Sequence, residues 1–346
     1  MRTVRLLATL LLFLLSSTAF PKDGLRVVWY NVENLFDTQH DSLHNDYEFL
    51  PDGKRHWTPG RYYNKLNQLS RVLIAAGRGE LPALVGLAEV ENDAVLRDLL
   101  RCSPLKTSDY RVLHFESPDT RGIDVALLYR PAVFHLLDGR RIPIHYPDSV
   151  SAGGKTRDLL VATGVVPNGD TLSVLLCHAP SKRGGAEQSL PKRMYVMQRL
   201  RAELDAVQAA YPGGYLLVMG DFNDTPESEC LRDGLRASLT PEALPEHGLY
   251  NMAARWAGCT SEGSYKYKAE WSMIDQMMAS AGLLRPTGLY VLPDGLRIMH
   301  DDFLLMPDTR YLGSKPRRSY SNQFYDAEGF SDHLPIYLDI RWQSAE

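Results

Sequence analysis

Asp221 and Asn223 directly follow an apolar run in the segment LVMGDFNDTP, which spans residues 217–226. Carboxylate and amide groups that follow a buried strand can meet at a sheet edge, where they bind a metal ion or a substrate. Asp, Asn and Pro are also common turn residues, because they hydrogen-bond to the local backbone or pre-set its conformation. The segment alone therefore leaves a plain turn and a chemical site as alternatives.

The same arrangement recurs beside other apolar runs of the chain. The polar residues at these positions are Asn31, Glu33 and Asn34, then Glu89 and Glu91, then His178, Ser181, Lys182 and Arg183, then Asp275, and finally Ser331, Asp332 and His333. Acidic and amide oxygens without thiolates suit a hard cation such as Mg²⁺ or Mn²⁺. Two histidines suit proton transfer near neutral pH. A hard cation with acid–base groups and basic side chains points to phosphoryl chemistry.

Short apolar, β-branched runs bounded by Gly, Pro and Asp recur from Leu25 to Trp342 and predict strands. Several are apolar at successive positions, which indicates sheets covered on both faces. Helical periodicity appears between them, over residues 61–77 with Leu66, Leu69, Leu73 and Ala76 on one face, and over residues 192–214 with Met197, Leu200, Leu204 and Val207. We expect residues 38–60 and 293–329, which are rich in Asp, His, Tyr, Arg and Pro, to form long loops.

Strands and helices interleave without a repeat, a low-complexity tract or a Ser/Gly-rich linker. This organisation favours one α/β domain, which we expect to span residues 24–343. The formal net charge of −4 gives the chain no overall basic character. Contact with a polyanion must therefore come from a local patch.

The first 19 residues carry two arginines, an apolar run from Leu6 to Leu15, and small residues ending at Ala19. This pattern predicts a secretory signal peptide and export to the periplasm or outside the cell. The apolar run is too short to span a bilayer comfortably, so we expect no stable membrane insertion after cleavage. The sequence leaves open whether disulfides form among its four cysteines, Cys102, Cys177, Cys230 and Cys259. Cys177 lies in an apolar run, which favours a buried thiol.

Together and in this order, the motifs YNVEN, LAEVEN, CHAP, GDFN and SDH resemble those of the endonuclease/exonuclease/phosphatase superfamily, most closely secreted bacterial members. The superfamily comprises metal-dependent phosphodiesterases, among them pancreatic-type deoxyribonucleases, apurinic-site endonucleases, sphingomyelinases and inositol phosphatases. The resemblance extends from Arg26 to Trp342. It implies a four-layer α/β sandwich, with two packed, mostly antiparallel sheets flanked by helices.

The resemblance also implies roles for individual residues. It implies that Mg²⁺ or Mn²⁺ is bound near Asn31, Glu89 and Asp332. It implies catalytic roles for His178, Asp221, Asn223, Asp275 and His333, with Asp275 orienting His333. Substrate contacts are implied for Tyr129 and Arg157, and the segments SKRGG and YKYKAEW add Lys182, Arg183, Tyr265 and Lys266 as candidates.

Several of these assignments have alternatives. Glu91 is two residues from Glu89 and faces the same way in a regular strand, and Glu33, Asn34 or Glu91 can share the metal site. His178 can be a core histidine at the end of its apolar run. SKRGG can be a solvated basic loop, and YKYKAEW an ordinary amphipathic strand.

Three functions follow from this interpretation. The leading one is a secreted, monomeric, metal-dependent nuclease, most simply an endonuclease, that hydrolyses DNA or RNA. The second is a phosphodiesterase or phosphatase acting on phospholipid head groups or small phosphorylated metabolites, which predicts an exposed apolar or aromatic hairpin beside the site, with Trp57, Phe303 and Tyr311 as the candidates. The third is a non-catalytic binding domain, which predicts gaps in the acid–base and metal set.

Overall fold

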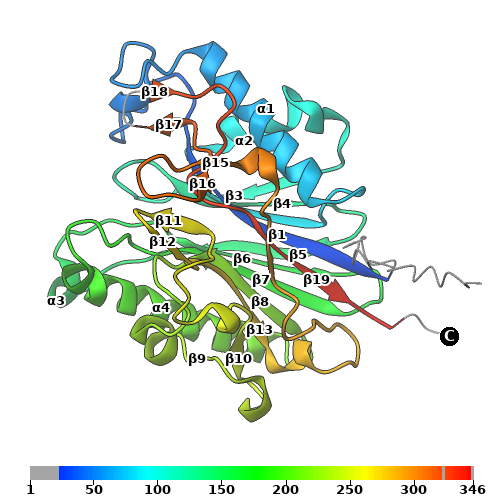
Figure 1. The fold of residues 1–346 in the computed structure, drawn as a ribbon. Helices are drawn as coiled ribbons and strands as arrows, with labels where there is room; N and C mark the ends of the chain where they lie inside the picture. Colours follow the sequence, from blue (N-terminus) through cyan, green and yellow to red (C-terminus); the bar gives the residue numbers. More distant parts are fainter. Residues whose placement is uncertain (1–22, 322–323, 344–346) are drawn as a thin grey trace, which may run out of the picture.

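Two stacked β-sheets form the centre of the computed structural model, which describes residues 23–321 and 324–343 (Figure 1). The predicted signal peptide lies outside the described residues. The first sheet has the order β14 (Arg297–Ile298), β19 (Ile336–Arg341), β1 (Gly24–Leu35), β2 (Leu84–Val90), β4 (Asp124–Tyr129) and β3 (Arg111–His114). The second has the order β5 (His135–Ile142), β6 (Leu159–Val165), β7 (Thr171–His178), β8 (Tyr215–Asp221), β13 (Asp275–Ser280), β10 (Leu249–Asn251) and β9 (Ala237–Ser238).

Most neighbouring strands in the two sheets are antiparallel, as predicted. The parallel pairs are β1 with β2, β7 with β8, and β9 with β10. The central strands β1, β7 and β8 are buried at almost every position, which explains their continuous apolar sequences. Each of these strands lies between the opposite sheet and a layer of helices.

Helices cover the outer faces of both sheets and complete the predicted four layers (Figure 1). α1 (Pro59–Ala76) and α2 (Asp93–Arg101) pack on the first sheet, and α4 (Ala186–Ala210) packs on the second. The single-turn α3 (Asp148–Ser151) contacts α4 and buries none of its residues. The predicted apolar faces of α1 and α4 are buried. α4 begins before the predicted start and ends at Ala210, ahead of the helix-breaking sequence at residues 212–214.

The segment 293–329, expected to be a long loop, contains small strands instead. These are β14, β15 (Leu305–Pro307), β16 (Ser314–Pro316), β17 (Tyr320–Ser321) and β18 (Phe324–Tyr325). Strands of two or three residues are too short to show an alternating pattern in the sequence. A further hairpin, β11 (Tyr265–Tyr267) with β12 (Glu270–Ser272), lies at the same side of the molecule as β15 and β16 (Figure 1).

Short 3₁₀- and π-helical turns complete the chain. They are η1 (Tyr47–Phe49), η2 (Pro104–Thr107), η3 (Cys230–Gly234), η4 (Pro241–Ala243), η5 (Ala254–Trp256), η6 (Ala281–Leu284) and η7 (Asp302–Leu304). The four cysteines, which all lie within the described residues, are unpaired, and Cys177 is buried as its apolar run indicates.

The strand register brings the chemical residues to one edge. In the second sheet His178 pairs with Asp221, which in turn pairs with Asp275 on β13. In the first sheet Asn31 lies beside Ala88, the residue before Glu89. The two stacked sheets therefore present these side chains together.

Candidate functional site

His333 is held by a buried carboxylate. Its Nδ1 atom lies 2.6 Å from Oδ2 of Asp275, which is fully buried. Asp275 also accepts hydrogen bonds from Nε1 of Trp29 (2.9 Å) and Oγ of Ser264 (2.6 Å). Burial lowers the pKa of His333, but the negative charge of Asp275 outweighs it and raises this pKa well above its ordinary value. Asp275 therefore fixes the ring of His333 and favours its protonated form.

Asp221 lies between the two predicted histidines. Its Oδ2 atom is 3.6 Å from Nε2 of His178 and 3.9 Å from Nε2 of His333. Asn31 donates from Nδ2 to the same oxygen (3.0 Å), and the backbone N–H of Asn223 donates to Oδ1 (2.9 Å). Burial raises the pKa of Asp221 to about 7. The residues around Asp221 that were predicted to be catalytic or to bind metal are therefore Asn31, His178, Asn223, Asp275 and His333.

His178 differs from His333 in its charge. Burial, followed by the charges of Arg157 and Arg121, lowers its pKa well below the ordinary value, so its ring is neutral. Its Nδ1 atom is buried and has no hydrogen-bond partner within the described residues. Arg157 is fixed beside it by bonds to Asp119 (2.9 Å) and the carbonyl of Ala179 (2.8 Å), while its own Nε is buried and unpartnered in the described part of the chain.

Backbone strain is concentrated at this edge. Four non-glycine residues have a left-handed conformation here: Glu33 (φ 53°), Asn34 (φ 53°), Glu89 (φ 64°) and Asn223 (φ 52°). Each such residue costs about 1–3 kcal/mol and persists only where the surroundings enforce it. Strain that coincides with a polar cluster is typical of a functional site.

A group of carboxylates lies next to the histidines. Arg318 forms ion pairs with Glu33 and with Asp332, the latter at 3.2 Å. Burial raises the pKa of Glu33 to about 7, and the charge of Asp332 acts in the same direction. Oε2 of Glu33 is buried without a hydrogen-bond partner in the described residues. This oxygen is available to a cation.

Glu89, rather than Glu91, is associated with this group. Glu89 lies at a bulge in β2 and accepts a hydrogen bond from the backbone N–H of Asn34 (2.9 Å). Its charge acts on Lys65, together with those of the other two carboxylates of the group. Glu91 instead accepts a hydrogen bond from the backbone of Asp37 (2.6 Å). The bulge interrupts the alternation that would have made the two glutamates equivalent.

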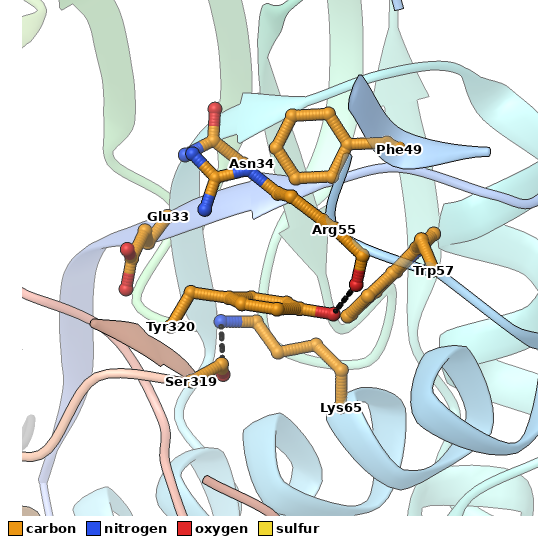
Figure 2. A pocket seen from close by; sticks show the side chains of 8 residues that line it. All are labelled: Glu33, Asn34, Phe49, Arg55, Trp57, Lys65, Ser319 and Tyr320. Atoms are coloured by element: carbon orange, nitrogen blue, oxygen red, sulfur yellow. Dashed lines mark hydrogen bonds between the residues drawn. The ribbon is translucent and has the colours of Figure 1, made fainter. Parts of the chain in front are cut away.

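Lys65 reaches this group from α1 and is fully buried. Figure 2 shows it in a pocket lined by Glu33, Asn34, Phe49, Arg55, Trp57, Lys65, Ser319 and Tyr320. Its ammonium donates to Oγ of Ser319 (3.1 Å) and to the carbonyl of Phe330. Phe330 precedes Ser331, whose hydroxyl donates to the carbonyl of Asn31 (2.7 Å). These bonds fix the segment that carries the Asp–His pair at 332–333.

Two predicted substrate contacts do not reach the site. Tyr129 pairs with Leu84 at the start of β2, about 16 Å along the strand from Glu89. The reason is that β4 runs antiparallel to β2, so the end of β4 lies at the opposite edge of the sheet. The ammonium of Lys266 is held by Asp308 (3.0 Å) and is not free to bind a phosphate.

The other predicted substrate contacts lie around the site. Tyr265 packs its ring against the imidazole of His333, with 4.9 Å between the ring centres. Lys182 pairs with Asp224 at 2.7 Å and is partly exposed. Arg183 is exposed, and its charge acts on the half-buried Arg121. SKRGG therefore contributes positive charge on the His178 side.

Three basic residues of the site were missed by the sequence interpretation: Lys65, Arg121 and Arg318. Lys65 and Arg318 belong to a helix and a long connecting segment, so no strand-end pattern marks them. Arg121 had a signal, because it lies just before the apolar run of β4 at the site edge. Burial lowers the pKa of Arg121, while the charge of Glu89 opposes this shift and the charge of Arg157 adds to it.

Two groups in the described part of the chain have ligand atoms close enough to share a metal ion. Asp221, Asp275 and His333 have ligand atoms within 4.8 Å of one another, as do His114, Glu116 and Asp124 where β3 ends and β4 begins. Asp275 already accepts three hydrogen bonds. These bonds use most of the acceptor capacity of the carboxylate and leave one lone pair for a further partner.

A model described as the endonuclease/exonuclease/phosphatase family matches residues 26–342. The chain belongs to this family. No curated protein matches it significantly. Membership confirms the resemblance on which the expected sandwich rested.

Solved structures of family members have the same fold. Humanized D. rerio TDP2 is 15% identical, with a TM-score of 0.55 and coverage of 92% of this chain and 99% of that one. The endonuclease/exonuclease/phosphatase from Bacteroides vulgatus is also 15% identical, with a TM-score of 0.55 and coverage of 93% and 100%. D. rerio TDP2 complexed with a single-strand DNA product is 15% identical, with a TM-score of 0.52 and coverage of 92% and 99%.

Proposed function

We propose that the protein is a divalent-metal-dependent phosphodiester hydrolase, and specifically a nuclease that cleaves DNA or RNA. The observation that carries the proposal is the position of Asp221, whose carboxylate lies within 3.6 Å and 3.9 Å of two histidine rings. An acid–base set of this kind beside a cluster of carboxylates suits phosphodiester hydrolysis. The family itself comprises metal-dependent hydrolases of such bonds.

The residues fit a hard divalent cation. Glu89, Asp332 and the amide oxygen of Asn31 would hold Mg²⁺ or Mn²⁺, and Glu33 lies beside them with its free buried oxygen. Burial and, after it, the charge of Asp332 raise the pKa of Glu33, and a cation bound here would offset both effects. When bound, the ion neutralises charge on the phosphoryl oxygens and orients the phosphate.

The two histidines and Asp221 have distinct roles in this proposal. Asp221, with a pKa of about 7, accepts the proton of the attacking water near neutral pH, held in place by Asn31 and Asn223. His333 is cationic, stabilises charge on the phosphoryl group through Nε2 and donates a proton to the leaving oxygen. The neutral His178 binds a phosphoryl or leaving oxygen by hydrogen bonding.

Basic side chains next to His178 suit a phosphate chain. Arg157 has a buried, unpartnered Nε, and Arg121 and Arg183 add charge close to it. These groups supply the local basic patch that a nucleic-acid substrate requires on a chain with negative net charge. The structure of D. rerio TDP2 with a single-strand DNA product shows that a family member of the same fold binds this type of ligand.

Export as a monomer completes the proposal. The charged, apolar and small-residue pattern of residues 1–19 supports a cleaved signal peptide. In residues 23–321 and 324–343, no helix has the length and apolar character needed to cross a bilayer.

The test is a substrate panel with the purified protein and Mg²⁺ or Mn²⁺. Plasmid DNA, RNA, sphingomyelin and bis-p-nitrophenyl phosphate are compared at equal enzyme concentration. The proposal predicts cleavage of nucleic acid and of bis-p-nitrophenyl phosphate. Hydrolysis of sphingomyelin without nuclease activity would replace the nuclease with a lipid phosphodiesterase.

A further inference from the structure

The hairpin β11–β12 leads from the candidate site to the solvent. Its first residue, Tyr265, forms an isolated β-bridge with His333 and packs against its ring. The hairpin β15–β16 lies beside it (Figure 1). An extended ligand leaving the site on this side would pass over both hairpins.

Asp308 joins the two hairpins. Its Oδ2 atom accepts a hydrogen bond from Nζ of Lys266 on β11 (3.0 Å). Its Oδ1 atom accepts from the backbone N–H groups of Arg310 (3.1 Å) and Tyr311 (3.2 Å) in the turn between β15 and β16. Lys266 also donates to the carbonyl of Leu312 (2.9 Å). The two hairpin tips are therefore fixed relative to each other.

Each hairpin tip carries an aromatic ring with a cation over it. Tyr267 is 63% exposed, and the ammonium of Lys268 lies 5.3 Å from its ring centre. The guanidinium of Arg310 lies 5.2 Å from the ring centre of Tyr311. Exposed rings beside basic groups stack bases and neutralise phosphates in proteins that bind single-stranded nucleic acid.

The position of Tyr267 along β11 relates its ring to the site. Residues two apart in a strand face the same way and are about 7 Å apart. Tyr267 therefore lies on the same face of β11 as Tyr265, one step further from His333. A base stacked on Tyr267 would belong to a nucleotide close to the phosphate at the site.

We propose that the tips of β11–β12 and β15–β16 form a docking arm for single-stranded nucleic acid. Tyr267 stacks on an unpaired base, and Lys268 and Arg310 contact the phosphates on either side. The inference rests on the proposed nuclease function and specifies its substrate class. In a duplex the base faces are covered by their neighbours, so this ring contact selects single strands or frayed ends.

A lipid surface fits the arm less well. Leu312, at 81% exposure, is an exposed aliphatic side chain between the basic and aromatic groups of the tips. Insertion into a bilayer requires a larger contiguous apolar face than Leu312 supplies together with two tyrosine rings that each have a cation over them. The alternating rings and cations match a nucleic-acid strand better than an acyl layer.

The experiment measures binding of a fluorescent oligothymidine of about 12 nucleotides, a length within the range that one such surface covers, by anisotropy in EDTA. Tyr267→Ala is compared with wild type and with Tyr63→Ala, which removes an exposed tyrosine of α1. We expect Tyr267→Ala to weaken single-strand binding by about 5- to 100-fold and Tyr267→Phe to restore it. Thermal melting checks that each variant is folded.

Two further measurements separate the phosphate contact of Lys268 from the base stacking on Tyr267. Lys268→Gln should lower the slope of log Kd against log salt by about 1, because one phosphate contact is lost. Binding of a blunt duplex should change by less than about twofold in Tyr267→Ala, because a duplex offers no free base face to the ring.

The outcomes distinguish this inference from the proposed function. If wild type cleaves nucleic acid but Tyr267→Ala binds single strands as well as Tyr63→Ala does, the docking arm is wrong and the nuclease stands. If wild type neither binds nor cleaves nucleic acid, both are wrong. Binding of the tips to phosphatidylglycerol vesicles, lost in Tyr267→Ala while oligothymidine binding is unchanged, would assign the arm to a lipid surface instead.

Discussion

Nδ1 of His333 lies 2.6 Å from Oδ2 of Asp275, although 57 residues separate them in the sequence. Asp275 begins β13, and His333 precedes β19 in the opposite sheet. The pair therefore bridges the two sheets at the edge where they meet. It fixes the tautomer and the charge of the imidazole at the same time.

Loss of this imidazole should abolish most of the activity. We expect His333→Ala to lower kcat on bis-p-nitrophenyl phosphate by about two to four orders of magnitude, the range for positioned acid–base groups. Asp275→Asn should cause a loss of similar size, because the neutral amide removes the charge that keeps His333 protonated. Steady-state kinetics at saturating Mg²⁺ measures both.

The double variant tests whether the pair acts as one unit. It should be scarcely slower than the poorer single variant, whereas strictly multiplicative losses would show that the two residues act independently. Asp275→Asn should also lower stability by about 1–3 kcal/mol, because its amide cannot accept hydrogen bonds from Trp29, Ser264 and His333 together. Thermal and urea unfolding separate this effect from the kinetic one.

Lys65 should act by positioning. Lys65→Met removes the ammonium that holds the carbonyl of Phe330, so the Asp332–His333 segment loses one of its supports. We expect kcat to fall by about 10- to 100-fold, the range for residues that orient metal ligands. Lys54→Met, at a lysine that is 65% exposed, is the matched control. Equal kcat values in the two variants would show that Lys65 does not position the site.

The strand ends explain which parts of the site could be predicted from the sequence. His178, Asp221 and Asp275 lie on neighbouring strands, so the rule that polar residues beside apolar runs share an edge places them correctly. Tyr129 was misplaced because the sequence of β4 does not reveal its antiparallel direction. Direction depends on pairing with β2 and β3, which is a tertiary property.

Long-range ion pairs explain why other site residues were misassigned or missed in the sequence. Lys266 was predicted to contact the substrate, but its partner Asp308 is 42 residues away and belongs to a segment expected to be a loop. Arg318 lies in the same segment and gains its role only when that segment folds over Glu33. The fold was predicted better than the site, because apolar periodicity is local and ion pairing is not.

The neutral state of His178 should appear in the pH dependence of stability. Its pKa is lowered in the folded protein, so the unfolded chain binds a proton first as the pH falls below about 6.5. Stability is then lost towards acid, by at most about 1.4 kcal/mol per pH unit for this residue. His178→Gln should make the free energy of unfolding fall less steeply between about pH 6.5 and about pH 5. An unchanged or steeper slope in urea titrations would contradict the neutral assignment.

Two neighbouring glutamates provide a matched test of the metal site. Glu89→Gln should weaken Mn²⁺ binding, measured by calorimetry, because a formal charge is removed from an all-oxygen site. Glu91→Gln should bind Mn²⁺ nearly as wild type does, since Glu91 is occupied by the backbone of Asp37 and burial raises its pKa to about 8. A larger loss of Mn²⁺ affinity in Glu91→Gln than in Glu89→Gln would show that Glu91, and not Glu89, binds the metal.

The dependence of hydrolysis on a divalent cation tests the central claim most directly. Wild-type protein is treated with excess EDTA, and the cleavage of bis-p-nitrophenyl phosphate and of oligothymidine is followed before and after Mg²⁺ is added beyond the chelator. The account predicts no hydrolysis of either substrate in EDTA and full recovery with Mg²⁺. Undiminished hydrolysis in EDTA would contradict it.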